Sequence, residues 1–224
     1  MTFAKKTGKV SRKLKVFIEA AILALLLALL LRTYVVQAYR IPSGSMEDVL
    51  VAGDFVLVYK LSFRLGEEPK PGDIVVFRYP LNPSKTYIKR IIALPGETVQ
   101  VLNKQVYVNG RPFLEPPTAK NTDRRHIPGE LSGRDNFGPL RVGPNQYFVM
   151  GDNRDQSEDS RFWGTVDKQH LIGKAMFVYW SWQPDPSSPK WESPYIVPFF
   201  ELFAYYMTNW PSKIRWSRIG SSTS

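Results

Sequence analysis

The apolar and polar positions divide the chain into one long apolar segment near its start and a series of short apolar runs after it. Residues 16–36 read VFIEAAILALLLALLLRTYVV, which is long enough to cross a membrane as a helix if Glu19 and Arg32 lie near its ends. The uninterrupted part, residues 20–31, is also the size of the apolar region of a secretory signal peptide, and residues 36–38 (Val-Gln-Ala) resemble a cleavage site. The residues alone support a permanent anchor and a cleaved signal equally.

Beyond Arg40 the apolar runs become short, β-branched and aromatic, which is typical of strands. Pro-Gly and Asn-Gly turn sequences separate these runs, and no long amphipathic helix lies between them. The pattern therefore predicts a mainly β domain over residues 40–224, built on an antiparallel sheet. Its predicted strands cover residues 55–59, 74–79, 87–93, 98–102, 105–108, 147–150 and 175–182.

Two stretches depart from this strand pattern. Residues 111–144 are rich in Pro, Gly, Arg, Asp and Asn without regular periodicity, which predicts a small inserted lobe beside the sheet. Residues 183–211 open with prolines and then carry many Trp, Tyr and Phe residues, as segments at a membrane interface do. A helix packed on the domain's own core explains that composition equally well. A second crossing by residues 196–210 is the weaker interpretation, because the segment is short and contains Glu201.

The formal net charge is +10, but the basic residues cluster in the tail, residues 1–15, directly before the apolar segment. This arrangement predicts a cytoplasmic amino terminus, with everything after about residue 38 on the far side of the membrane. It does not indicate nucleic-acid binding, which needs basic residues gathered on a folded face. Cysteine is absent and His126 and His170 have no metal-ligand spacing, so a metal site is not expected.

Ser45, within the sequence IPSGSM at 41–46, is a candidate nucleophile only if a base lies within hydrogen-bond reach. By itself the hexapeptide is an ordinary Ser/Gly turn. A candidate base is Lys89, because strand alternation places it on one face with Tyr87 and Ile91. Partial desolvation on that face would lower the lysine pKa toward ~7–8, where the amine can accept a proton near neutral pH. An exposed strand lysine is the simpler alternative.

A third polar segment, GDNRDQSEDSR at 151–161, directly follows a predicted strand. It resembles a calcium-binding loop only loosely, because it lacks the glycine at the sixth position and carries Arg154 and Arg161 as internal cations. The composition favours a loop held by ion pairs and hydrogen bonds. In such a loop Ser157 could present its hydroxyl to an active-site group.

Taken in order, these segments resemble the bacterial type I signal peptidases. The motifs that carry the resemblance are PSGSM (42–46), GDFVLV (53–58), GDIVVFRYP (72–80), YIKRIIALPGE (87–97) and GDNRDQSEDSRFWG (151–164). The likeness covers most of residues 15–182. RWSRIG at 215–220 is similar to the closing strand of that family.

The resemblance implies a role for each matching residue. Ser45 would be the nucleophile and Lys89 the general base, and the Ser43 hydroxyl with the Ser45 backbone N–H would form the oxyanion hole. Ser157 would hydrogen-bond and orient Lys89. The remaining assignments are structural ion pairs at Arg90, Asp159 and Arg161, and a substrate pocket lined by Met46, Tyr87 and Ile88.

The family likeness also implies an enzyme that keeps residues 16–36 as a single membrane anchor in the cell membrane, with its catalytic domain outside the cytoplasm. Its implied partners are the phospholipid membrane and preproteins that carry signal peptides, cut after small-x-small sites. No cofactor is implied. The alternatives are a self-cleaving Ser-Lys regulator, a basic β-domain that only binds, and a secreted β-protein. The apolar segment disfavours the regulator, in which a DNA-binding motif would be expected instead.

One departure from the family lies beside the candidate nucleophile. The family commonly has proline and threonine soon after the Ser-Met pair, whereas this chain has Glu47, Asp48 and Val49. Acidic charge is therefore expected close to Ser45.

Overall fold

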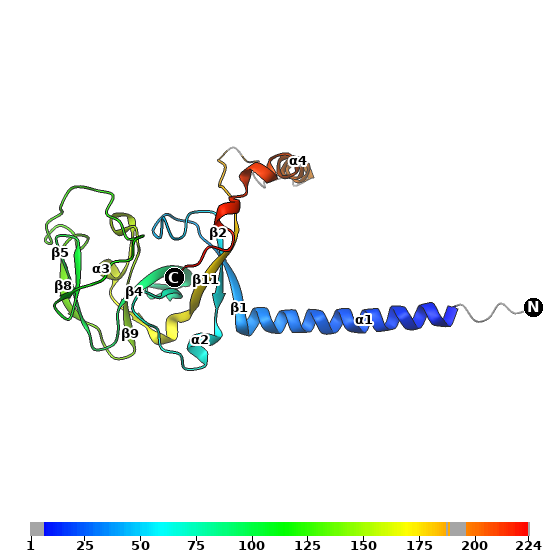
Figure 1. Ribbon diagram of the computed structural model, residues 1–224, viewed down its shortest axis with the longest axis horizontal. Coiled ribbons are helices and arrows are strands. Elements are labelled where there is room, and N and C mark those ends of the chain that lie inside the picture. Colours follow the sequence, from blue (N-terminus) through cyan, green and yellow to red (C-terminus); the bar gives the residue numbers. More distant parts are fainter. Residues whose placement is uncertain (1–6, 187, 189–195, 224) are drawn as a thin grey trace, which may run out of the picture.

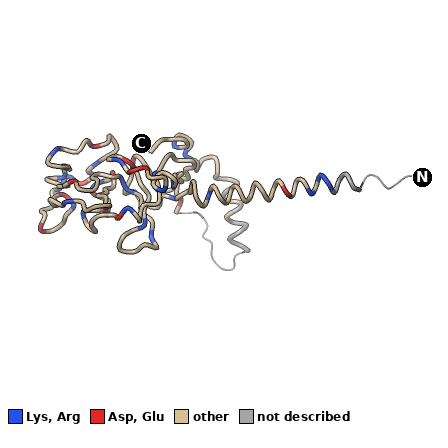
Figure 2. The backbone as a smooth tube through the Cα atoms, turned by 90° about the horizontal axis from the view of Figure 1, so that it is seen from below, with Lys and Arg blue, Asp and Glu red and all other residues tan. Residues whose placement is uncertain are grey.

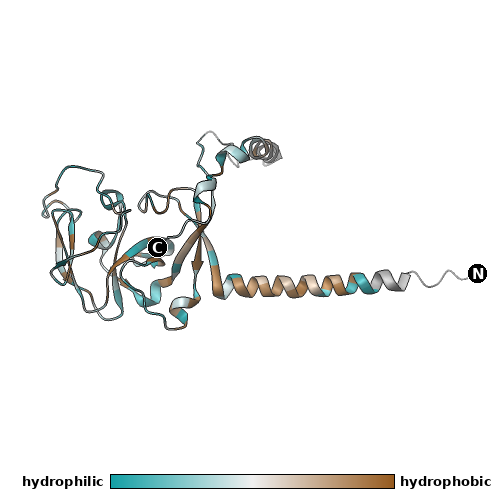
Figure 3. Ribbon diagram, viewed as in Figure 1, coloured by the Kyte–Doolittle hydropathy of each residue, from teal (hydrophilic) through white to brown (hydrophobic). Residues whose placement is uncertain are grey.

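The N-terminal apolar segment forms a helix that stands away from the rest of the molecule (Figure 1). The computed structural model describes residues 7–186, 188 and 196–223. Helix α1 spans Thr7–Leu30, and a π-helical turn, η1 (Leu31–Val35), follows it. The apolar part of α1 is exposed along its length (Figure 3). Within the described chain, Arg12–Val35 is the one helix long and apolar enough to cross a membrane.

The boundaries of α1 differ from the predicted segment 16–36 at both ends. The helix begins earlier, at Thr7, because lysine and arginine are good helix formers and let it continue back into the basic tail. The basic residues of α1 accordingly lie at the end of the helix remote from the domain (Figure 2). At the other end Val36 already belongs to strand β1 (Val36–Arg40). The helix therefore leads into the main sheet with only η1 between them.

An antiparallel sheet of seven strands forms the body of the domain, in the order β1-β2-β11-β3-β4-β9-β10. The mainly β, antiparallel prediction is confirmed. Strands β1 and β10 were not expected, and β4 starts before the predicted position. The strands after β1 are β2 (Asp54–Tyr59), β3 (Ile74–Tyr79), β4 (Asn82–Ala93), β9 (Gln146–Met150), β10 (Val166–Asp167) and β11 (Leu171–Ser181).

A second sheet of four strands, in the order β7-β6-β5-β8, lies at the end of the domain remote from α1 (Figure 1). Its valines pack with Ile92, Phe148 and Met150 of the main sheet, so the two sheets share a core. The residues predicted as a lobe, 111–144, supply two of these strands. The sheet consists of β5 (Thr98–Leu102), β6 (Gln105–Val108), β7 (Arg111–Pro112) and β8 (Phe137–Arg141).

Helix α4 (Ile196–Lys213) projects beside the domain on the same side as α1. In Figure 1 α1 runs across the view while α4 is seen nearly end-on, so the two axes lie far from parallel. Of the aromatic stretch 183–211, Trp191 and Tyr195 lie outside the described residues. The other short helices are α2 (Leu61–Arg64), η2 (Arg154–Gln156), α3 (Ser160–Trp163), η3 (Lys168–His170) and η4 (Trp216–Arg218).

The closing strand expected at 215–220 is not formed. Residues Trp216–Arg218 make a single 3₁₀ turn, with isolated bridges only at Ile214 and Ser222. The turn directs the guanidinium groups of Arg215 and Arg218 to the fully buried Asp54, at 3.3 and 2.6 Å. A 3₁₀ turn places residues three apart on the same side, so this conformation lets both cations reach one carboxylate.

Candidate active site

The loop that carries Ser45 is anchored in the core on both sides. Ile41 and Met46 are 2% and 0% exposed, and both pack in the cluster around Val56 and Val58. The backbone N–H of Ile41 donates to the carbonyl of Asp54 at 2.8 Å, which fixes the start of the loop to β2. Two buried apolar side chains therefore hold the short polar turn between them against the sheet.

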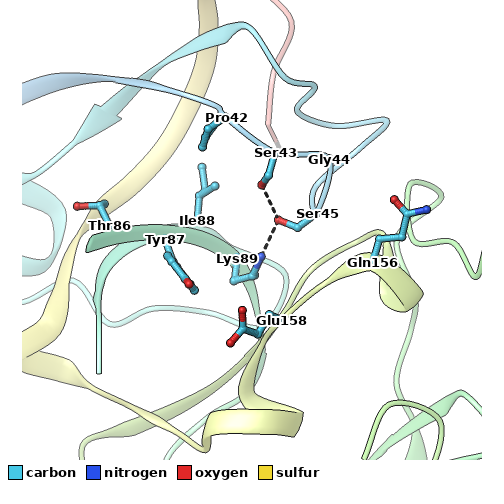
Figure 4. Close-up of a pocket in the computed structure, with 10 residues that line it drawn as sticks. All are labelled: Pro42, Ser43, Gly44, Ser45, Thr86, Tyr87, Ile88, Lys89, Gln156 and Glu158. Atoms are coloured by element: carbon cyan, nitrogen blue, oxygen red, sulfur yellow. Dashed lines mark hydrogen bonds between the residues drawn. The ribbon is translucent and has the colours of Figure 1, made fainter. Parts of the chain in front are cut away.

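Lys89 lies on β4, opposite Val75 of β3, and its side chain follows the predicted alternation. Tyr87 and Ile91 pack in one apolar cluster, while Ile88 packs against another on the opposite face. The Lys89 ammonium lies 2.6 Å from the Ser45 hydroxyl (Figure 4). Both residues are buried, at 4% and 9% exposed. The structure thus brings together the candidate nucleophile and base across 44 residues of sequence.

The electrostatic environment of Lys89 favours the neutral amine. Burial, the largest effect, lowers the pKa of Lys89 from 10.5 to about 8. Asp159 acts in the opposite direction and raises the pKa, whereas Arg161 lowers it. An amine with this pKa is neutral in a useful fraction of molecules near neutral pH, which a general base requires.

Two hydrogen-bond donors lie at the candidate oxyanion position. The Ser43 hydroxyl is 3.5 Å from the Ser45 hydroxyl, and both line the same cavity (Figure 4). Among the residues that the structure describes, the backbone N–H of Ser45 has no acceptor. A backbone N–H without an acceptor in a residue that lines the cavity is available to donate to a substrate carbonyl oxygen.

The loop after β9 packs directly on the Ser45 loop through Gly151 and Asn153. The Asn153 backbone N–H donates to the Ser45 carbonyl at 3.1 Å, and its side-chain amide donates to the Gly44 carbonyl at 3.3 Å. A Cβ on Gly151 would lie 2.5 Å from the Ser45 carbonyl oxygen and 2.3 Å from the Ser157 hydroxyl. Only glycine permits this close approach. Neither residue was singled out from the sequence, although both lie in the GDN motif.

Ser157 is placed near the dyad but does not make the expected contact. Its hydroxyl is buried and has no hydrogen-bond partner in the described chain, so the predicted bond to Lys89 is absent. The side chain is instead held close to Gly151. A buried hydroxyl without a partner is costly, and a hydrogen bond with a group that enters the site would remove this cost. The Ser157 hydroxyl is available for such a bond.

The three residues expected to form ion pairs do so, in two separate pairs. The Arg161 guanidinium binds the fully buried Asp159 at 2.8 Å, and Asp159 also accepts from the Gly151 N–H at 3.1 Å. Arg90 binds Asp152 through two hydrogen bonds of 2.8 and 2.6 Å. Asp152, which sequence reasoning did not identify, thus ties the loop to the strand that carries Lys89. Paired in this way, the buried charges fix the loop against β4.

The cavity at the dyad has a volume of about 360 Å³. Tyr87 and Ile88 line it as expected, but Met46 is fully buried in the core and does not. Its place in the predicted pocket is therefore wrong: the side chain points below the loop and anchors it. Other lining residues that the sequence did not indicate are Pro42, Gly44, Thr86, Gln156 and Glu158.

The acidic residues beside the nucleophile are held by Lys120. Its ammonium lies 3.2 Å from Glu47 and 3.0 Å from Asp48, and the Asn153 amide also donates to Glu47 at 3.1 Å. Asp48 adopts a left-handed backbone conformation, with φ of +82°. Lys120 comes from the inserted stretch 111–144, so that stretch contacts the Ser45 loop directly.

Comparison with known proteins identifies the family. The family described as "Signal peptidase, peptidase S26" matches residues 14–180. This chain belongs to that family. It is similar to signal peptidase I of Pseudomonas aeruginosa, with 36% identity over 72% of this chain and 70% of the relative. It is also similar to signal peptidase I of Bacillus licheniformis, with 39% identity over 80% and 95%.

Membership of this family makes the chain a serine peptidase. A third relative, signal peptidase I of Aquifex aeolicus, is 35% identical over 77% of this chain and 86% of its own length. Among solved structures, a signal peptidase I from Enterococcus faecalis V583 shares 30% identity, covering 48% of this chain and 96% of that protein with a TM-score of 0.39. That score is too low to compare the two folds in detail.

Proposed function

We propose that this chain is a membrane-bound endopeptidase that removes N-terminal signal peptides from exported preproteins, with Ser45 as nucleophile and Lys89 as general base. The observation that carries the assignment is the 2.6 Å contact between the buried Lys89 ammonium and the Ser45 hydroxyl. A serine hydroxyl becomes a competent nucleophile when a neighbouring base takes its proton. The lowered pKa of Lys89, about 8, suits it to that task.

The proposed reaction follows from these positions. Neutral Lys89 accepts the Ser45 proton as the serine oxygen attacks the scissile carbonyl, and a tetrahedral intermediate forms. The Ser45 N–H and the Ser43 hydroxyl donate to its oxyanion. The lysine then gives its proton to the departing amine, which leaves an acyl-enzyme. Lys89 next takes a proton from a water molecule that attacks the ester; the bond between the acyl carbon and the Ser45 oxygen then breaks, the lysine returns the proton to that oxygen, and the acyl product leaves with a free carboxyl group.

The substrate is proposed to bind as an added strand along β4. Residues 82–89 of β4 pair with β3 on one side only, since pairing with β9 involves positions from Arg90 onward. An extended peptide can bond to such an open edge and place alternate side chains in pockets. Ile88 and Pro42 are apolar residues that line the cavity beside Ser45 (Figure 4). This supports small residues at the first and third positions before the cut.

The anchoring and orientation are proposed from α1. Its exposed apolar length favours a crossing, and the basic residues at its far end favour a cytoplasmic amino terminus. Helix α4 is proposed to dock on the membrane surface, because its axis runs across that of α1 and its Met207 and Trp210 are 64% and 49% exposed. The proposed catalytic domain then lies outside the cytoplasm.

The test of the dyad is cleavage of a preprotein by the full-length protein in detergent, with the new amino terminus read by mass spectrometry. Ser45→Ala and Lys89→Ala should each abolish cleavage after a small-x-small site. Lys70→Ala is the matched control, because Lys70 is an exposed lysine that neither lines the cavity nor lies on β4. Ser43→Ala should lower kcat by roughly 10²–10³-fold with little change in KM. Cleavage that survives Lys89→Ala at the wild-type rate would exclude Lys89 as the base.

The test of docking by α4 compares two substrates with the same cleavage site. Removing residues 190–210 should slow cleavage of a vesicle-embedded preprotein, while a soluble peptide in detergent is cut as before. Met207→Glu with Trp210→Glu should do the same without a deletion. Equal rates on embedded substrate would contradict the docking role and leave the dyad unaffected.

A further inference from the structure

A second cavity, with a volume of about 610 Å³, lies where the domain meets the end of the membrane helix. Its walls come from β1, α2, β3, the start of β4, η3 and the start of β11. The charged and titratable residues on these walls are Tyr39, Lys60, Arg64, Arg78, Lys168 and His170, and no Asp or Glu lines the cavity. The cavity is therefore strongly electropositive and within the size range of ligand-binding clefts.

Most of these cations have no anionic partner within the described chain. Lys60 is 7% exposed, yet its ammonium donates only to neutral oxygens, the Arg32 carbonyl at 3.3 Å and the Gln37 side chain at 3.2 Å. Arg64 lies over the Tyr34 ring at 5.9 Å, and no carboxylate of a described residue lies within ion-pair distance of it. A buried cation without an anion is costly, and Lys60 bears this cost, whereas Arg64 is exposed.

The remaining charged residues of the cavity also carry more positive than negative charge. Arg78 forms no ion pair with a described residue, and only Lys168 is matched, by Glu68 from outside the cavity. The Nδ1 atom of His170 is buried without a hydrogen-bond partner. Burial, followed by the repulsion of Arg64, lowers the pKa of Lys60. The negative charge of a bound anion would act against both effects and raise this pKa.

The position of the cavity indicates which anion it would meet. Lys60 bonds to η1 directly and Arg64 stacks on a tyrosine of η1, so the cavity opens beside the last turn of the apolar helix. Figure 1 shows α2 next to the junction of α1 with β1. Apolar Phe63, Leu171 and Ile172 share the walls with the cations. A phosphate joined to an apolar body is the ligand that such mixed walls fit.

We propose that this cavity binds the headgroup phosphate of an anionic phospholipid from the membrane leaflet that faces the catalytic domain. The cations neutralise the phosphate and the apolar wall contacts the glycerol and the first carbons of the acyl chains. The proposal rests on the anchoring of α1 proposed above and not on the dyad. A lipid held here fixes the domain at one depth and rotation on the membrane surface.

The experiment titrates the full-length protein, in uncharged detergent, with phosphatidylglycerol or phosphatidylcholine of identical acyl chains. Native mass spectrometry counts the bound lipid. Wild type should bind phosphatidylglycerol more tightly. Arg64→Gln with Arg78→Gln should weaken that binding by roughly 30-fold, because each cation near an anionic lipid contributes about fivefold. The matched control is Arg111→Gln with Arg141→Gln, two exposed arginines on the remote sheet.

Three outcomes would overturn the proposal: equal affinity of the wild type for the two lipids, an equal loss in the control pair, or full displacement by millimolar inorganic phosphate. The last would make the site one for free phosphate. Peptide cleavage in detergent should be the same in all variants, which confirms their folding. Resistance of the wild type to alkaline extraction from membranes tests the α1 anchor separately.

Discussion

The buried charge of Lys89 is expected to lower the free energy of unfolding of the native protein. Burial lowers its pKa from 10.5 to about 8, and each unit corresponds to about 1.4 kcal/mol, so the fold disfavours the charged form by about 3 kcal/mol. Below pH 8 Lys89 is charged in both the native and the unfolded state, and the full cost of burying its charge opposes folding. Between about 8 and 10.5 the unfolded chain keeps a proton that the native state has released, so native stability rises with pH. Above that range the cost disappears.

Replacing Lys89 with methionine, of similar shape, removes the charge and also the hydrogen bond to Ser45, which is worth about 1 kcal/mol. Lys89→Met should therefore abolish catalysis and yet raise the free energy of unfolding by roughly 2 kcal/mol at pH 7. The gain should shrink between pH 8 and 10.5. The assay is urea unfolding of the full-length protein in mild detergent at 25 °C, followed by tryptophan fluorescence.

Lys85→Met provides the control, because this lysine lies exposed on the same strand. Its free energy of unfolding should differ little from that of the wild type at any pH. Two results would refute the reasoning. One is a Lys89→Met protein no more stable than the wild type at pH 7. The other is a gain that stays constant up to pH 11, which would mean that packing, not charge, causes it.

Three further predictions concern contacts around the dyad and the core. Gly151→Ala should lower kcat at least ~100-fold, since the added Cβ would displace the Ser45 loop. An unchanged kcat would contradict the close approach of Gly151 to the Ser45 carbonyl oxygen. Lys120→Met should lower kcat severalfold, whereas Lys120→Arg should retain it, because the cation holds Glu47 and Asp48. An equal kcat in the two variants would exclude a role of this charge in positioning the Ser45 loop. Asp54→Asn should cost about 3–5 kcal/mol in urea unfolding at pH 7. The wild type should lose this stability as the pH falls below about 4. Burial, the largest single effect, raises the pKa of Asp54, but hydrogen bonds from Arg218, Ser181 and Val51 together with the Arg218 charge lower it overall. A stability difference that does not change in acid would contradict this.

The strands that the sequence predicted best are those whose apolar residues alone define a buried face. Strands β3, β5 and β6 match the predicted ranges. Strand β8 was missed because its sequence, FGPLR, contains Gly and Pro and forms a strand only through pairing with β5. Strand β1 was missed because it follows the apolar helix without a turn signal. Tertiary pairing, which local propensity does not encode, decided both.

The candidate site likewise has some features that the sequence could predict and others that it could not. Ser45 and Lys89 could be proposed from residue chemistry and family likeness, but their 2.6 Å separation depends on how the Ser45 loop docks across β4. The contacts that hold that loop join residues far apart in sequence, such as Asn153 with Gly44 and Lys120 with Asp48. Met46 was wrongly predicted to line the pocket, because its place next to the nucleophile in the sequence does not determine the direction of its side chain.

The arrangement of charges explains why burial can set the pKa of the base. Asp159 and Arg161 lie close enough to act on Lys89 in opposite directions, and they are bonded to each other at 2.8 Å. A carboxylate and a guanidinium in contact largely cancel as seen by a third charge. Arg90 and Asp152 form a second closed pair. These pairs supply the rigidity that fixes the loop against β4, while Glu158 and Asp152 join Asp159 in raising the pKa of Lys89 by less than burial lowers it. The apolar surroundings of Lys89 then remain the main determinant of its proton affinity.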